Sequence, residues 1–324
     1  MKLTVTPHYA PLKQAFAISR GAKTEAVTVR VTLEEDNAIG RGESVPYSRY
    51  NETVEGVLKA IERHRSDIEA GIDREVLQTL MPAGAARCAV DCALWDLEAK
   101  QTGKPAWQLA GLPEPRSMET AVTVSLDTPD AMAEAAISTP SRLLKLKLGN
   151  GEDLERLKAV HHARPDARLI VDGNEGLDPE SFRRLAEHGA TLGVVLIEQP
   201  FPADADDKLL RYCGPVSVCA DESAHTSADI ERLSRTYDAV NIKIDKAGGL
   251  TEAMAMAREA RRAGMGIMVG CMVAGSLSMA PALLLAGLAD AADLDGPLWL
   301  AEDIENGLTY EDGRVSPPER ALWG

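Results

Sequence analysis

Five charged residues recur between positions 147 and 243 at intervals of 22 to 26 residues, and each stands at the end of a short apolar segment. They are Lys147, Asp172, Glu198, Asp221 and Lys243. If the three carboxylates converge, their negative charge requires a cation, and oxygen ligands without Cys or His favour a hard ion such as Mg²⁺ or Mn²⁺. The two lysines stand before and after the carboxylates, so they could remove a proton from one face of a carbon atom and return a proton to the other.

The spacing of these charges also predicts the elements that position them. Short apolar segments alternate with helical patterns from residue 120 onward, which is typical of a parallel sheet. The predicted strands are Thr120–Leu126, Leu143–Leu148, Arg168–Asp172, Val194–Glu198, Val216–Asp221, Ala239–Lys243, Gly266–Gly270 and Ala291–Asp295. Eight strands can close into a barrel, and the charges then lie at the carboxyl ends of the strands, where barrel enzymes carry out catalysis.

Helical segments such as Asp153–Ala163 and Pro179–His188 lie between these strands. The helix Thr251–Ala263 is expected to begin with Thr251 as its N-cap and to stop at Gly264.

The first part of the chain has a different pattern. Ala26–Leu33 alternates apolar and polar residues, as expected for a half-buried strand. Val54–Ile68, Arg74–Leu80 and Ala83–Lys100 have the apolar spacing of helices. We therefore expect an α+β unit ahead of the barrel.

The composition excludes several classes of partner. The chain has 324 residues and a formal net charge of −15, which disfavours nucleic acid and anionic membrane surfaces. No apolar run is long enough for a transmembrane helix, and residues 1–10 lack the pattern of a signal peptide. The five cysteines form no C-x-x-C pair, which indicates a reduced cytoplasmic protein.

Several motifs resemble the muconate lactonizing enzyme subgroup of the enolase superfamily. The matching segments are K-L-K at Lys145–Lys147, V-D-G-N at Val171–Asn174, I-E-Q-P at Ile197–Pro200, A-D-E-S at Ala220–Ser223, N-I-K-I-D-K-A-G-G at Asn241–Gly249 and A-L-W-D-L at Ala93–Leu97. Within this subgroup the chain is most similar to the L-Ala-D/L-Glu epimerases, which are dipeptide epimerases. That similarity rests on D-L-D-G-P at Asp293–Pro297, P-Y-S-R-Y at Pro46–Tyr50 and G-C-M at Gly270–Met272.

The resemblance implies an α/β fold, a modified TIM barrel (β/α)7β with an N-terminal α+β capping domain. Residues 1–115 would form the capping domain, residues 116–296 the barrel with the catalytic site, and residues 297–324 a segment that returns to the cap. It also implies a cytoplasmic enzyme of murein peptide metabolism with a small dipeptide as its partner. The oligomeric state, including a homo-oligomer, stays open.

The resemblance further implies a two-base reaction. Asp172, Glu198 and Asp221 would bind Mg²⁺, and Lys147 and Lys243 would be the acid/base pair. The enzyme would invert the α-carbon of the C-terminal residue of a dipeptide, L-Ala-L-Glu or L-Ala-D-Glu, by 1,1-proton transfer through an enediolate.

A second set of residues would bind the substrate: Lys145, Thr123, Cys271, Asp293, Asp295 and Arg20. Lys145 would contact the substrate carboxylate, and Asp293 and Asp295 would take the terminal ammonium group of the dipeptide. Arg20 is the candidate for the side-chain carboxylate of glutamate, with Arg49 as a weaker candidate.

Four other functions share parts of this pattern. An o-succinylbenzoate synthase or a muconate cycloisomerase would use the same lysines and metal ligands, but neither needs two carboxylates facing an ammonium group. A racemase of N-acylated amino acids lacks that need as well, because its substrate has no free ammonium. A non-catalytic binding barrel predicts the loss of a lysine or a ligand, and the chain retains all of them.

Overall fold

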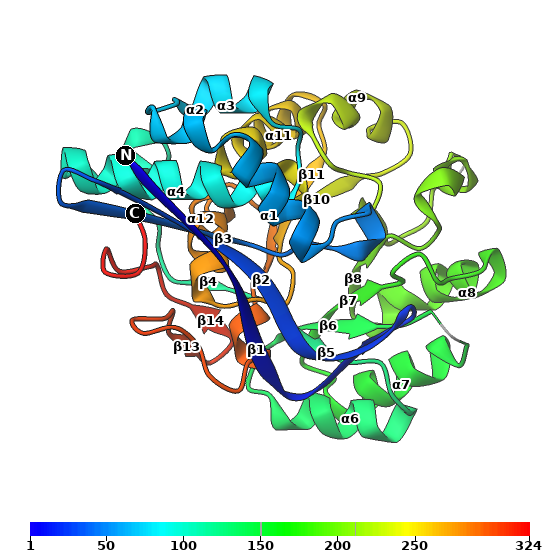
Figure 1. The fold of residues 1–324 in the computed structure, drawn as a ribbon. Helices are drawn as coiled ribbons and strands as arrows, with labels where there is room; N and C mark the ends of the chain where they lie inside the picture. The colour runs from blue at the N-terminus through cyan, green and yellow to red at the C-terminus, as the bar shows by residue number, and fades with distance from the viewer. Residues whose placement is uncertain (150, 211) are drawn as a thin grey trace.

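The computed structural model describes residues 1–149, 151–210 and 212–324. Its central element is an eight-stranded parallel sheet with the order β12-β11-β10-β9-β8-β7-β6-β5 (Figure 1). The strands are β5 (Val122–Val124), β6 (Leu143–Lys147), β7 (Arg168–Asp172), β8 (Val194–Glu198), β9 (Ser217–Ala220), β10 (Ala239–Ile242), β11 (Gly266–Gly270) and β12 (Ala291–Asp293). Each strand lies within a segment predicted from the sequence, so those predictions are confirmed.

The first and last strands of this sheet are joined by single hydrogen bonds. Ala121 N donates to Ala292 O at 2.8 Å. Thr123 N donates to Asp295 Oδ2 at 2.7 Å. These contacts close the sheet into a barrel, and the second one connects β5 to a carboxylate beyond the end of β12.

Helices follow the strands and cover the outside of the barrel (Figure 1). They are α6 (Pro129–Ser138), α7 (Asp153–Ala163), α8 (Pro179–Gly189), α9 (Ile230–Leu233), α10 (Ile244–Ala247), α11 (Leu250–Arg262) and α12 (Ser276–Ala286), with short 3₁₀ segments at Ala190–Leu192, Ala203–Leu209, Ser227–Asp229 and Gly296–Trp299. The apolar faces of these helices and the outer faces of the strands form one continuous core.

The N-terminal unit is an antiparallel sheet packed on helices. The sheet contains β1 (Lys2–Ile18), β2 (Gly21–Glu35) and β3 (Ala38–Ser44). The helices are α1 (Val54–Arg63), α2 (Arg65–Glu69), α3 (Arg74–Leu80), α4 (Ala85–Thr102) and α5 (Ala106–Leu109), and Ser48–Tyr50 forms a 3₁₀ turn. The single helix predicted over Val54–Ile68 is wrong in one respect, because the backbone leaves the helical region at His64 (φ −104°, ψ 14°) and divides it into α1 and α2.

Helix α4 of this unit contacts the junction of α10 and α11 in the barrel. Arg87 donates to Ala247 O at 2.6 Å and to Gly248 O at 3.1 Å. Asp91 Oδ2 accepts from Thr251 N at 3.1 Å. The contact is so close that a Cβ atom on Gly249 would lie 2.4 Å from Asp91 Oδ2.

The predicted N-cap of α11 is therefore wrong. The helix begins at Leu250, and Gly249 (φ 117°) is the N-cap. Thr251 lies inside the first turn, where Asp91 accepts from its backbone N–H and its hydroxyl accepts from Trp95 Nε1 at 3.0 Å. A carboxylate from another element thus supplies the acceptor that an N-cap side chain normally provides. The predicted stop is confirmed, because Gly264 follows the helix in the left-handed region (φ 74°).

The last residues of the chain return to α4. Strand β14 (Arg314–Val315) pairs with β13 (Tyr310–Glu311) on one side and with β4 (Met118–Glu119) on the other. Beyond them, Trp323 Nε1 donates to Cys92 O at 3.0 Å. Gly324 N donates to Asp96 Oδ1 at 2.7 Å. The two chain ends consequently lie on the same side of the molecule in Figure 1.

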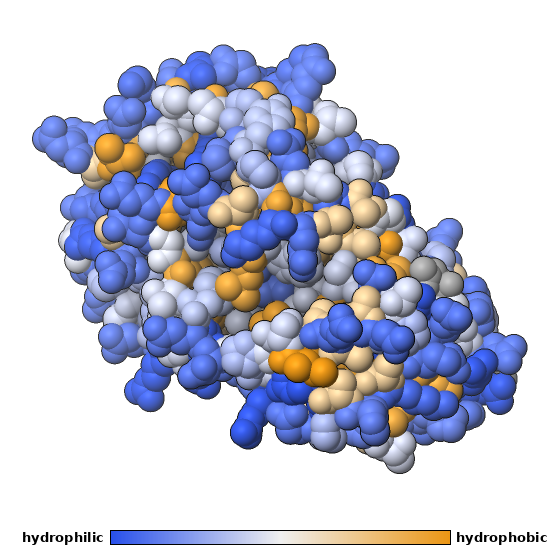
Figure 2. Space-filling view, turned by 90° about the horizontal axis from the view of Figure 1, so that it is seen from below, coloured by the Kyte–Doolittle hydropathy of each residue, from blue (hydrophilic) through white to orange (hydrophobic). Residues whose placement is uncertain are grey.

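The face of the molecule in Figure 2 is mostly hydrophilic, as expected for a chain with a net charge of −15. Hydrophilic residues cover most of the periphery of this face, and hydrophobic residues gather toward its middle (Figure 2). Among the described residues, no helix is both long and apolar enough to span a membrane.

The close contact between α4 and the barrel predicts that Gly249→Ala strongly destabilises the protein. The new Cβ would meet Asp91, and the backbone (φ 117°) is strained for any L side chain. We expect the free energy of unfolding to fall by about 3 kcal/mol, measured by urea denaturation. Gly264→Ala is the control, because Gly264 also has a positive φ (74°) but no atom within 4 Å of the new Cβ. It should cost only about 1 kcal/mol, and equal losses would contradict the role of the close contact.

Candidate active site

Three carboxylates meet at the carboxyl ends of neighbouring strands. Asp172 ends β7, Glu198 ends β8, and Asp221 directly follows β9. They are 0%, 0% and 2% exposed, and one oxygen atom of each lies within 4.8 Å of the others. The register pairs Asp172 with Glu198 across β7 and β8, so adjacent parallel strands place these charges side by side.

Ammonium groups surround the carboxylates. Lys145 Nζ lies 2.7 Å from Glu198 Oε2 and 3.1 Å from Asp172 Oδ2. Lys147 Nζ donates to the same Asp172 oxygen at 2.6 Å, so both lysines of β6 point to one side, as residues two apart on a strand must. On the other side of the cluster, Lys243 Nζ donates to Asp221 Oδ2 at 2.6 Å.

Each carboxylate also has one oxygen atom that is held from outside the cluster. The outer contacts are Asn174 N to Asp172 Oδ1 (2.9 Å), Asn241 Nδ2 to Glu198 Oε1 (2.7 Å) and Lys246 Nζ to Asp221 Oδ1 (2.5 Å). The second oxygen atom of every carboxylate therefore faces the same central region.

The pKa shifts differ from one carboxylate of the cluster to the next. Burial and the neighbouring charge of Asp172 raise the pKa of Glu198 to about 8. Burial alone would lower the pKa of the Lys145 ammonium group. The carboxylates around it outweigh burial and raise that pKa well above the ordinary value. Burial similarly opposes ionisation of Asp221, while Lys243 and Lys246 hold the pKa of this carboxyl well below its usual range.

This arrangement fits a divalent cation. Glu198 Oε2 is buried and accepts no hydrogen bond of normal geometry from the described residues, although Lys145 Nζ is close. The inward-facing donors are all carboxylate oxygen atoms. Such a donor set suits a hard ion and offers nothing to a soft one.

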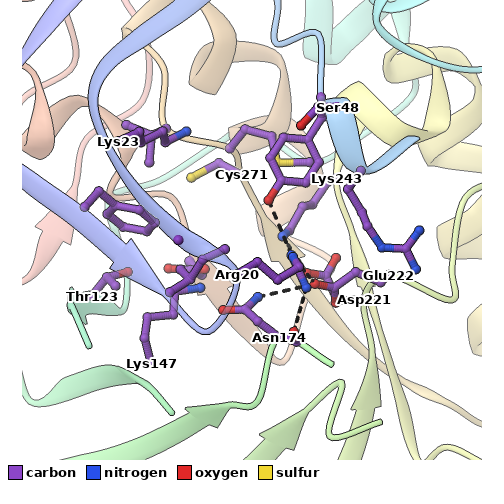
Figure 3. A pocket seen from close by; sticks show the side chains of 18 of the residues that line it. Arg20, Lys23, Ser48, Thr123, Lys147, Asn174, Asp221, Glu222, Lys243 and Cys271 are labelled. Atoms are coloured by element: carbon purple, nitrogen blue, oxygen red, sulfur yellow. Dashed lines mark hydrogen bonds and ion pairs between the residues drawn. The ribbon is translucent and has the colours of Figure 1, made fainter. Parts of the chain in front are cut away.

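A cavity of 420 Å³ opens beside the carboxylates (Figure 3). It lies between the barrel mouth and two loops of the N-terminal unit, and its polar lining includes Arg20, Lys23, Ser48, Thr123, Lys147, Asn174, Asp221, Glu222, Lys243, Cys271, Asp293 and Asp295. Its apolar side includes Phe16, Ile18, Met272 and Val273. Both candidate bases and five of the six predicted substrate-binding residues therefore border one space. The sixth, Lys145, lies below it among the carboxylates.

The two carboxylates near the end of β12 have different partners. Asp293 Oδ2 accepts from Lys145 Nζ at 2.8 Å. Asp295 Oδ2 accepts from Thr123 N at 2.7 Å and from Trp299 Nε1 at 3.3 Å. Burial and the nearby charge of Asp293 raise the pKa of Asp295 to about 6. A cation in the cavity would therefore relieve the repulsion between these two carboxylates.

Arg20 is bound to several groups at once. It lies in the tight turn between β1 and β2, and its guanidinium contacts Glu222 Oε1 at 2.8 Å and Asn174 O at 2.6 Å. It also lies 3.2 Å from Glu175 Oε2. Arg49, from the second loop, donates to both carboxylate oxygen atoms of Glu175 at 2.7 and 2.6 Å. Both loops of the N-terminal unit are thus connected to the segment that follows β7.

Sequence reasoning did not single out Lys23, which enters the same cavity. Its ammonium lies 5.8 Å from the centre of the Phe16 ring, and no carboxylate in the described part of the chain pairs with it. Burial lowers the pKa of Lys23 from 10.5 to about 8; the charges of Lys147 and Lys243 act in the same direction and the Cys271 thiol opposes them. The sequence indicated only that this hairpin borders the substrate, because the direction of a side chain depends on the register of β1 with β2.

Known families and curated proteins are similar to this chain over most of its length. Residues 1–111 match the family described as mandelate racemase / muconate lactonizing enzyme, N-terminal domain, and residues 130–321 match the family described as enolase C-terminal domain-like. The L-Ala-D/L-Glu epimerase of Escherichia coli strain K12 is 44% identical, over 94% of this chain and 96% of that protein. The N-acetyl-D-glutamate racemase of a Pseudoalteromonas species is 43% identical, over 91% and 94%.

Solved structures agree with these relatives. An enolase family member from Agrobacterium tumefaciens, with homology to dipeptide epimerases and with bound sodium and L-Ala-L-Glu, has a TM-score of 0.97, 48% identity and 99% coverage of both chains. A dipeptide epimerase from Methylococcus capsulatus, complexed with Mg and L-Arg-D-Lys, has a TM-score of 0.90 and 32% identity, covering 98% and 97%. The chain belongs to the mandelate racemase and muconate lactonizing enzyme family of the enolase superfamily, and it is an isomerase. The predicted fold and the resemblance to the dipeptide epimerases are confirmed.

The buried contacts of Lys145 predict that Lys145→Met destabilises the metal-free protein. The change removes the ammonium group and leaves the carboxylates of Asp172, Glu198 and Asp293 to repel one another. In EDTA we expect the free energy of unfolding to fall by about 3–5 kcal/mol, measured by urea denaturation. Lys59→Met is the control, because Lys59 pairs with Glu55 on the surface. It should leave stability almost unchanged, and a similar loss in both variants would argue against this reading of the cluster.

Proposed function

We propose that this isomerase is a Mg²⁺-dependent dipeptide epimerase whose preferred substrates are L-Ala-L-Glu and L-Ala-D-Glu. The observation that carries the proposal is one cavity bordered by two lysines, by Asp221 of the carboxylate cluster and by a second carboxylate pair. Support also comes from the relatives, whose names include epimerization of L-Ala-D/L-Glu, and from the solved structure that holds L-Ala-L-Glu.

In this proposal Asp172, Glu198 and Asp221 hold Mg²⁺. When bound, the ion supplies the positive charge that stabilises negative charge on the substrate carboxylate. Lys145 adds a second positive charge beside the same carboxylate. The buried contacts of the Lys145 ammonium group with Asp172 and Glu198 hold this positive charge in place.

Lys147 and Lys243 then transfer the proton. One lysine, as the neutral amine, takes the α-proton from its face of the substrate while the C–H bond breaks. The other lysine, as the ammonium ion, gives a proton to the opposite face of the same carbon. The two residues exchange roles for the opposite enantiomer, and they border the cavity from different strands, each against a different carboxylate.

The ends of the dipeptide find complementary charges in the cavity. Asp293 and Asp295 would bind the terminal ammonium group, and Thr123 and Cys271 would contact the peptide between the two ends. At the other end, Arg20 would contribute positive charge toward the side-chain carboxylate of glutamate. The charge of Arg20 is shared with Glu222.

Lys23 is the cation in this part of the cavity without a carboxylate partner among the described residues, so we add it to the proposed specificity site. The side chain of Lys23 has fewer polar contacts within the protein than that of Arg20. We therefore expect Lys23 to contribute more than Arg20 to the selectivity for an acidic side chain.

The first test is proton exchange in D₂O. The protein, Mg²⁺ and L-Ala-L-Glu are incubated, and the glutamate α-proton is followed by NMR. We expect deuterium at the α-position and the appearance of L-Ala-D-Glu. Lys147→Ala and Lys243→Ala should each reduce epimerization by at least about 10³-fold, because each removes an acid/base group. Wild-type rates in Lys243→Ala would exclude the two-base scheme, and no exchange with any dipeptide would exclude the dipeptide assignment.

A second candidate function is racemization of N-acetylglutamate, which the 43% identical relative favours. This substrate has no ammonium group, so it would not use the Asp293 and Asp295 pair. N-acetyl-L-glutamate in the same exchange assay separates the two functions. Asp295→Asn should raise the KM for L-Ala-L-Glu and leave N-acetyl-L-glutamate unaffected; if N-acetyl-L-glutamate exchanges faster than every dipeptide, the second function is the correct one.

Lys23 predicts a specific pH dependence. As the pH rises through about 8, Lys23 loses its charge, so the KM for L-Ala-L-Glu should rise while the KM for L-Ala-L-Gln does not. Lys23→Met should raise the KM for L-Ala-L-Glu about tenfold at pH 7, the loss of one charged contact, and remove this rise. Arg20→Met is the matched variant, with a smaller expected effect on selectivity. Equal changes in the KM values for both dipeptides in Lys23→Met would show that Lys23 does not recognise the glutamate side chain.

A further inference from the structure

Gln199 has an unusual backbone conformation beside the carboxylate cluster. It follows Glu198 directly, it is fully buried, and its φ of 32° lies in the left-handed region although it is not glycine. Its backbone N–H still donates to Cys219 O at 2.9 Å, so it continues the contact of β8 with β9. A residue is held in such a conformation only when the surrounding contacts require it.

The side chain of Gln199 supplies those contacts. Its Oε1 accepts from Asp221 N at 2.8 Å and from Ser223 N at 3.1 Å. Because both partners are backbone N–H groups that can only donate, the orientation of the amide is fixed. Gln199 therefore reaches from the residue after one carboxylate to the backbone amide of the next.

The amide nitrogen of Gln199 is anchored on the opposite side. Nε2 donates to Phe201 O at 2.9 Å, to Ser223 Oγ at 2.9 Å and to Tyr237 OH at 3.0 Å. Asp206 Oδ1 in turn accepts from Tyr237 OH at 2.6 Å and from Ser223 Oγ at 2.8 Å. This buried network extends away from the cavity, and neither Gln199 nor its partners Ser223, Tyr237 and Asp206 line that space.

We propose that Gln199 is a positioning residue that sets the separation of the Glu198 and Asp221 carboxylates for the divalent cation. The inference rests on the proposed metal site. The two carboxylates repel each other, and they sit at the ends of separate strands that could spread apart. The Gln199 amide joins those strand ends directly, so the spacing of the donor oxygen atoms is built before the ion arrives. Residues that orient ligands in this way commonly change metal affinity by 10–100-fold when replaced.

The chemistry of glutamine is necessary at this position. Methionine has a similar length but cannot accept from Asp221 N or Ser223 N. Asparagine keeps the amide but is one methylene shorter, so it cannot reach both the Asp221 amide and the anchoring groups around Tyr237. Both changes should release the strand ends without touching a ligand or a residue that contacts the substrate.

The test is Mg²⁺ binding to the apoprotein by isothermal titration calorimetry, with MgCl₂ alone as the probe. Gln199→Met and Gln199→Asn should each weaken the Kd at least about tenfold. Tyr237→Phe is the matched control, because it removes one hydroxyl from the same buried network and leaves both contacts of Gln199 Oε1 in place. It should change the Kd by less than about threefold. Circular dichroism and thermal unfolding establish that each variant is folded.

The outcomes separate the alternatives. A merely structural role would lower the melting temperature of the Gln199 variants and leave their Kd as in the wild type, which would overturn the proposal. If Gln199→Met does not fold, Gln199→Asn gives the same test with the same two outcomes. A wild-type protein that binds no Mg²⁺ would refute the metal site and this inference together, whereas unchanged affinity in a folded Gln199 variant refutes the role of Gln199 alone.

Discussion

The burial of three carboxylates within a few ångströms of one another is the constraint on which the rest of the structure depends. An uncompensated buried carboxylate costs several kcal/mol, and neighbouring like charges add to that cost. Lys145, Lys147 and Lys243 place positive charge against Asp172, Glu198 and Asp221, and Lys246 adds more from outside. The barrel makes this balance geometrically feasible, because parallel strands carry their carboxyl ends to one rim. Two of the groups that balance the charge, Lys147 and Lys243, are the ones that the proposed proton transfer would use.

Much of the barrel could be predicted because its information is local. Most strands are apolar runs with a charge at or near the end, and a helical segment follows each of them within a short distance. The carboxylates of Asp172, Glu198 and Asp221 could be grouped for the same reason: one unit of spacing between strand ends becomes one step around the rim. The two lysines of β6 could be assigned to one side by the alternation of a strand, and the structure has them sharing one Asp172 oxygen.

The parts that could not be predicted depend on contacts between distant segments. Thr251 has the sequence of an N-cap, but Asp91, 160 residues earlier, accepts the hydrogen bond instead. Lys23 and Arg20 occupy the same hairpin, and only the register of two strands decides which of them keeps a free charge. Gln199 lies within the I-E-Q-P motif, but the motif does not reveal that its side-chain amide joins two strand ends.

Residues 321–324 have a consequence for biosynthesis. Trp323 packs against α4 and donates to Cys92, which the ribosome adds 231 residues earlier. At about 5–20 residues per second, roughly 10–45 seconds separate the two events. For most of that time the barrel helices α10 and α11, which contact α4, have not been made either. The N-terminal unit is made before the barrel, but the surface that α4 buries against α11 and Trp323 is covered only after those segments are made, and it is the surface that a chaperone would meet on the nascent chain.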